Sequence, residues 1–97
     1  MKRLYFDTPR SFTEYFNERT KEITDHIFNC VREGIEEKKK NILLFEVEVE
    51  GNEYMFDISL PKKEWVKALE GCLAHYEELN AEDECIDTYL LMQKLKS

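Results

Sequence analysis

Residues 41–60 constrain the fold more than any other part of this sequence. From residue 45 to residue 50, apolar and acidic side chains alternate strictly, which is the period of a β-strand with one buried face. Gly51-Asn52 then provides a dipeptide typical of two-residue hairpin turns, and a second alternating run covers residues 53–60. The sequence therefore predicts an antiparallel β-hairpin over residues 42–60.

A two-residue turn also fixes which residues of the hairpin face each other. The cross-strand pairs on one face are then all apolar: Val49 with Tyr54, Val47 with Phe56, Phe45 with Ile58, and Leu43 with Leu60. A shift of one residue would exchange the two faces of the strand. We expect Val47 and Phe56 to be buried neighbours, so that Phe56→Ala costs about 3–5 kcal/mol of stability.

The opposite face of the hairpin is acidic. It carries five carboxylates, with Leu44, Met55 and Ser59 between them: Glu46, Glu48, Glu50, Glu53 and Asp57. Glu46 faces Asp57 and Glu50 faces Glu53, and like charges directly opposite each other destabilise a sheet. Either this face is simply solvated, as exposed antiparallel faces usually are, or a basic partner neutralises it. If a partner exists, these five residues are the predicted contact.

The charge of the chain limits the partners it can have. The 97 residues are enough for one domain, residues 1–97, and they carry a net charge of −7. This balance argues against direct nucleic-acid binding and against an anionic membrane, because both need a positive surface. The sequence shows no apolar run of membrane-spanning length and no signal-peptide pattern, and its three cysteines are an odd number. We expect reduced thiols and a cytoplasmic location.

A long helix is expected before the hairpin. Ser11 to Glu14 match the S-x-x-E capping box, and apolar residues continue at helical spacing to about Lys39. Such a helix would be about 40 Å long, more than a small domain covers. We therefore expect a break near Arg19-Thr20, where Arg19 interrupts the apolar stripe, or an end that overhangs onto a partner. Residues 3–6 have β character and are the candidate for a third strand.

Two helices are expected after the hairpin. The first starts at Pro61 and presents an apolar face at helical spacing: Trp65, Leu69, Cys72, Leu73, Tyr76 and Leu79. Asn80 is the expected N-cap of the second, whose apolar side is formed by Ile86, Tyr89, Leu90 and Met92 with Cys85 beside them. Leu91 and Leu95 fall outside that side. The order of elements predicts an α+β domain, with helices packed on one face of a small antiparallel sheet.

The C-terminal pattern resembles a known docking element. Leu73, Tyr76-Glu77-Glu78, Cys85-Ile86, Leu90-Leu91 and Leu95 are similar to the UVR motif, a helical hairpin of bacterial excision-repair proteins that binds other proteins. That motif usually has small residues where Cys85-Ile86 stand and an Arg-Asp pair where Tyr89-Leu90 stand. The alternative is an ordinary helical hairpin that closes the core, and we adopt it.

The sequence offers little for catalysis. The glycines stand alone, so no phosphate-binding loop is encoded, and no local signature supports a nucleophile with its base. We therefore predict no enzymatic activity, no catalytic residue and no cofactor. The alternative is a metal site, in which two pairs at helical spacing would form a Cys₂His₂ set: His26, Cys30, Cys72 and His75.

These observations favour a small acidic protein that acts by contact with another protein, in the manner of bacterial or phage accessory proteins. The alternative function is that of a small metal-binding protein. We also expect a homodimer, because the first helix is long and several apolar residues are left outside the predicted core: Ile42, Leu44, Met55, Leu91 and Leu95.

Overall fold

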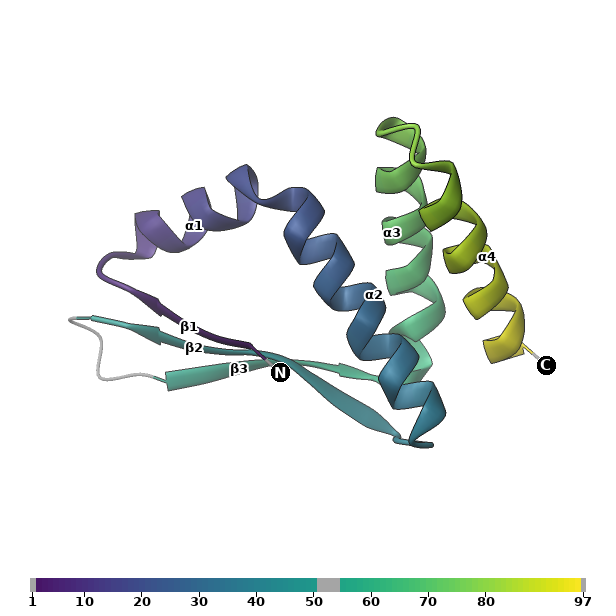
Figure 1. Ribbon diagram of the computed structural model, residues 1–97. Coiled ribbons are helices and arrows are strands. Elements are labelled where there is room, and N and C mark those ends of the chain that lie inside the picture. The colour runs from purple at the N-terminus through teal and green to yellow at the C-terminus, as the bar shows by residue number, and fades with distance from the viewer. Residues whose placement is uncertain (1, 51–54, 97) are drawn as a thin grey trace.

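The computed structural model describes residues 2–50 and 55–96, and these form an α+β fold (Figure 1). Along the chain the elements are β1 (Lys2–Phe6), α1 (Pro9–Glu18), α2 (Thr20–Glu36), β2 (Asn41–Val49), β3 (Met55–Pro61), a 3₁₀ turn (Lys62–Glu64), α3 (Trp65–Glu78) and α4 (Glu82–Lys96). The predicted fold class is confirmed. The hairpin turn at Gly51-Asn52 lies outside the described residues, as does the expected Val49–Tyr54 pair.

The sheet has three strands in the order β1-β2-β3, with β2 in the centre. The N-terminal strand is confirmed, and it pairs parallel to β2, with Leu4 opposite Val47. β3 pairs antiparallel to β2 on the other side, and the predicted Phe45–Ile58 and Val47–Phe56 pairs are present. The helices lie on one side of this sheet and leave its other side uncovered (Figure 1).

A β-bulge at Leu44 corrects the register that the sequence suggested. Beyond the bulge Leu43 faces Ser59, and Ile42 takes the place opposite Leu60. The physical reason is that residues 42–45 are all apolar, and one extra residue lets both Leu44 and Phe45 turn inward. Leu44 is thus buried instead of lying on the acidic face. Its carbonyl oxygen accepts a hydrogen bond of 2.7 Å from Nε2 of His26.

The two residues of the Val47–Phe56 pair have very different environments. Val47 is fully buried, because it lies on the central strand beneath the helices, whereas Phe56 on the outer strand is 41% exposed. Phe56 contacts the ring of Phe12 edge to face, with 5.9 Å between centroids. The expected burial of Phe56 was therefore wrong, and the cost of Phe56→Ala falls to about 1–2 kcal/mol.

The predicted break in the first helix is confirmed at Arg19, which separates α1 from α2. The predicted capping box is wrong, because the helix begins earlier. Thr8 is the N-cap, its Oγ1 accepts the Ser11 amide hydrogen at 3.1 Å, and Pro9 takes the first helical position. α1 arches over one end of the sheet, while α2 runs toward α3 (Figure 1).

The packed centre of the molecule lies where the last turns of α2 meet α3 and the start of β2. Trp65 is fully buried there, and its Nε1–H donates to the carbonyl oxygen of Leu60 at 2.9 Å. Gly34 leaves room for this ring and for Ile42. α2 ends at Glu36, earlier than expected, and Lys38 adopts a positive φ of 56° in the turn that follows.

The C-terminal helix is rotated from the predicted orientation, because Met92 is the one buried residue of the four that the sequence placed on its apolar side. Thr88, Leu91 and Met92 are buried, whereas Ile86, Tyr89 and Leu90 are 54–59% exposed. Both sides of this helix carry apolar residues, so periodicity alone could not choose between them. Asn80 also has a different role from the expected one. It adopts a φ of 55° and closes the end of α3, with the Ala81 amide donating to the Tyr76 carbonyl at 3.0 Å.

The described chain is extended for its size. The Cα atoms span 45 × 30 × 15 Å with a radius of gyration of 14.4 Å, whereas a compact domain of this length has about 13 Å. Within residues 2–50 and 55–96 there is no helix with the length and apolar character that crossing a bilayer requires.

Candidate interaction surfaces

The uncovered side of the sheet, which we call the open face, carries the predicted acidic residues. Glu46 and Glu48 lie at alternate positions of β2, Asp57 lies opposite Glu46 on β3, and Glu50 follows directly after the strand, close enough to hydrogen-bond Tyr5. Glu53 lies outside the described residues. The structure therefore gathers four of the five predicted carboxylates on one surface, while their role in binding stays a prediction.

The parallel strand β1 adds to the open face a residue pair that the hairpin alone did not reveal. Arg3 lies beside Glu46 in the register, and its guanidinium approaches the Glu46 carboxylate at 3.2 Å. This ion pair offsets part of the repulsion between Glu46 and Asp57. Because the Glu46 side chain is only 18% exposed, it is the least available carboxylate of the group.

Tyr5 lies on the edge strand β1, next to the carboxylates of the open face. It lies opposite Glu48 in the register and is 59% exposed. Its pKa is raised above the ordinary tyrosine value by hydrogen bonding to Glu50, by desolvation, and by the charges of Glu50, Glu48 and Asp7. Met55, on the other side of Glu48, is 58% exposed. The open face thus combines carboxylates with two exposed apolar side chains.

The four residues of the metal alternative have separate environments. Cys30 Sγ lies 3.5 Å from His26 Nε2, and this pair faces the bulge of β2. Cys72 instead contacts the Thr24 carbonyl of α2 at 3.8 Å, and burial raises the pKa of its thiol to about 11. His75 is half-buried, next to Tyr76. Across the described ranges, no three His, Cys, Asp or Glu side chains form a group that could hold a metal ion.

A polar network between α2 and α3 was not found from the sequence. The Tyr76 hydroxyl donates to one carboxylate oxygen of Asp25, and Lys21 Nζ lies 2.9 Å from the other. Burial opposes ionisation of Asp25, but these two donors outweigh it and lower the pKa of its carboxyl. The buried phenol has a raised pKa, through desolvation and then through Asp25. Since Tyr76 is only 2% exposed, we interpret this network as structural.

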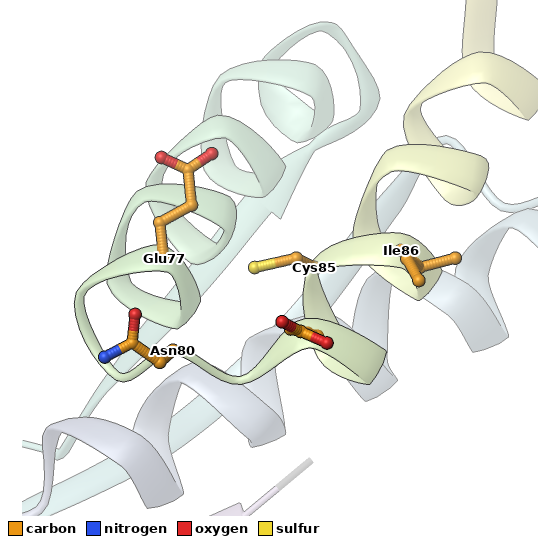
Figure 2. Close-up of a pocket in the computed structure, with 5 residues that line it drawn as sticks. Glu77, Asn80, Cys85 and Ile86 are labelled. Atoms are coloured by element: carbon orange, nitrogen blue, oxygen red, sulfur yellow. The ribbon is translucent and has the colours of Figure 1, made fainter.

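A second surface lies at the C-terminal helical hairpin. Between the end of α3 and the start of α4 there is an open hollow of about 400 Å³, lined by Glu77, Asn80, Glu82, Cys85 and Ile86. In Figure 2 the sulfur of Cys85 points toward α3, whereas Ile86 points to the opposite side. Desolvation and the nearby carboxylates of Glu77 and Glu84 raise the pKa of the Cys85 thiol. The exposed side chains of Ile86, Tyr89 and Leu90 continue this surface along α4.

No protein-family model matches the chain, and no significant match was found among curated proteins or solved structures. The helical hairpin of α3 and α4 is present, but the resemblance of its sequence to the UVR motif has no support from these comparisons. Function must therefore be inferred from the surfaces themselves.

Proposed function

We propose that this chain is a non-enzymatic protein-interaction module whose open face binds a lysine- or arginine-rich segment of another protein. The observation that carries the proposal is the placement of Glu46, Glu48, Glu50 and Asp57 on one side of the sheet, with Arg3 as the basic residue paired among them. Such a concentration of one charge steers a complementary partner toward the surface.

The spacing of the carboxylates favours an extended partner segment. Alternate residues of a strand lie about 6.6–6.8 Å apart, and this is the interval between Glu46 and Glu48 on β2, with Glu50 following directly after the strand. An extended peptide has the same interval between its alternate side chains. Lysine or arginine at every second position would therefore meet these three carboxylates in register.

The exposed apolar residues of the open face add contacts that are independent of charge. Tyr5 and Met55 flank Glu48 on the two neighbouring strands. A tyrosine ring at an exposed site attracts a guanidinium or ammonium group placed over its face. Met55 adds a flexible apolar side chain suited to the aliphatic part of lysine or arginine.

A labelled ten-residue peptide of alternating lysine and threonine provides the test. We expect Glu48→Gln/Glu50→Gln/Asp57→Asn to weaken its binding at low salt at least ten-fold, and the effect to shrink as salt screens charges beyond about 8–10 Å. This variant retains Glu46, because that carboxylate pairs with Arg3.

The matched control removes three exposed carboxylates from the helices: Glu18→Gln/Glu70→Gln/Glu78→Gln. Both triple variants change the net charge from −7 to −4, since each neutralises three carboxylates. The control is expected to lose less than three-fold in affinity. Equal losses in the two variants would show that the peptide responds to total charge only, and would refute the open face as the binding site.

A further inference from the structure

The outer side of α4 carries a compact apolar stripe that the fold does not use. Ile86, Tyr89 and Leu90 are spaced i, i+3 and i+4, and they are 57%, 54% and 59% exposed. The opposite side of the same helix is packed into the molecule through Thr88, Leu91 and Met92. When a helix has two apolar sides and only one packs against its own chain, the other side is available to bind a partner.

The charges at the two ends of α4 are opposite in sign. The first turn is acidic, with Glu82, Asp83 and Glu84, and the last turn is basic, with Lys94 and Lys96. This order also suits the helix dipole, so it does not by itself indicate a partner. A partner is indicated instead by the position of each acidic and basic pair relative to the apolar stripe along the helix.

The two charged pairs and the apolar stripe are centred within one residue of each other along α4. Asp83 and Lys94 are centred between residues 88 and 89, Glu82 and Lys96 at residue 89, and the stripe at residue 88. At 3.6 residues per turn, Asp83 and Lys94 lie within about 20° of each other around the helix, and Glu82 and Lys96 within about 40°. Each acidic residue and its basic counterpart therefore lie along the same flank.

These relations make the outer side of α4 complementary to itself in one orientation. In an antiparallel pair with a two-fold axis near Tyr89, a residue before the axis meets the residue at the same distance after it, on the same flank. Glu82 then meets Lys96 of the other copy, Asp83 meets Lys94, and the stripes meet in the centre. A parallel pair would instead place like charges together at both ends.

We infer that the exposed side of α4 binds α4 of a second copy of this chain, antiparallel, around a two-fold axis near Tyr89. The helix is about 22 Å long, so the buried area lies below that of a stable dimer and the association is weak and reversible. Lys94 also interacts within its own chain. For that reason the Glu82–Lys96 contact is the one to test.

Sedimentation over a wide range of concentration tests the surface. The wild type is expected to shift from monomer to dimer, whereas Ile86→Ser/Leu90→Ser should stay monomeric with an unchanged circular dichroism spectrum. Tyr5→Ser/Met55→Ser is the matched control, because it removes two apolar side chains of nearly equal exposure (59% and 58%) from the open face. The control should dimerise as the wild type does.

Charge reversal tests the orientation. Glu82→Lys or Lys96→Glu alone should weaken the dimer several-fold, because each places like charges together twice in a homodimer. An equimolar mixture of the two variants should recover the wild-type affinity, since each contact in the mixed dimer then joins opposite charges.

Three results would overturn the inference. A wild type that remains monomeric at the highest concentration would leave a different protein as the occupant of this surface. A dimer lost in Tyr5→Ser/Met55→Ser but kept in Ile86→Ser/Leu90→Ser would place the interface on the sheet. Single charge reversals without effect would exclude the antiparallel arrangement.

Discussion

Two helical glycines allow a direct test of the packing between α2 and α3. A Cβ atom added to Gly34 would lie 2.8 Å from Cγ2 of Ile42 and 2.9 Å from Cη2 of Trp65, whereas one added to Gly71 would meet no atom within 4 Å. The same substitution, glycine to alanine, should therefore have opposite effects at the two positions.

The size of each effect follows from the surroundings. In a helix interior, alanine is favoured over glycine by about 0.8–1 kcal/mol, so Gly71→Ala should stabilise the protein by that amount. Gly34→Ala has the same gain, but it overpacks a site that cannot easily relax. The Trp65 ring is fully buried and its Nε1–H is bonded to Leu60. Overpacking a core costs about 1–3 kcal/mol, so after the gain in helix propensity the net effect is a loss of up to about 2 kcal/mol.

Urea unfolding followed by the fluorescence of Trp65, the single tryptophan, measures both variants. The midpoint of Gly71→Ala should rise and that of Gly34→Ala should fall, with a difference of about 1–3 kcal/mol between the two free energies of unfolding. If Gly34→Ala stabilised the protein as much as Gly71→Ala does, then α2 and α3 would not approach each other as closely as described, and the argument would be refuted.

Two further predictions concern titratable groups. Tyr76→Phe should cost about 1 kcal/mol at neutral pH, because Asp25 loses a donor. The lowered pKa of Asp25 means that its contribution is present above the ordinary value of 3.8 and is lost as the pH falls through the folded value, so the deficit of the variant should shrink in acid; a deficit that grew in acid would contradict this. In the native protein an alkylating reagent should modify half-buried Cys85 before buried Cys30 and Cys72, as mass spectrometry of early time points would show, and equal rates would contradict the described burial.

The features that the sequence predicted correctly are those in which neighbouring side chains differ in polarity or charge. The alternation of residues 45–50 specified a strand with two unlike faces, and Arg19 interrupted an apolar stripe at the point where the first helix breaks. The same contrast identified the acidic face, because carboxylates at every second position must share a side of the strand. Local pattern was sufficient in each case.

The features missed from sequence depend on contacts between distant segments. Nothing local to Arg3 indicates that β1 pairs parallel to β2 and thereby brings this side chain to Glu46. On α4 the apolar residues surround much of the helix, so only its packing against α3 and α2 shows that Leu91 is buried and Leu90 exposed. The surface proposed here for self-association was therefore the one that the sequence had assigned to the core.

The bulge at Leu44 determines how this strand can change in length. Up to the bulge, the inward side chains have even residue numbers, Ile42 and Leu44. After the bulge they have odd numbers: Phe45, Val47 and Val49. Deleting Leu44 would restore a regular ladder, in which Phe45 and Ile42 still point inward and Leu43 still faces outward. Because that deletion removes one buried leucine but turns no other side chain of the strand, we expect it to be better tolerated than a single-residue deletion between residues 45 and 49. There, a deletion would turn glutamates into the core.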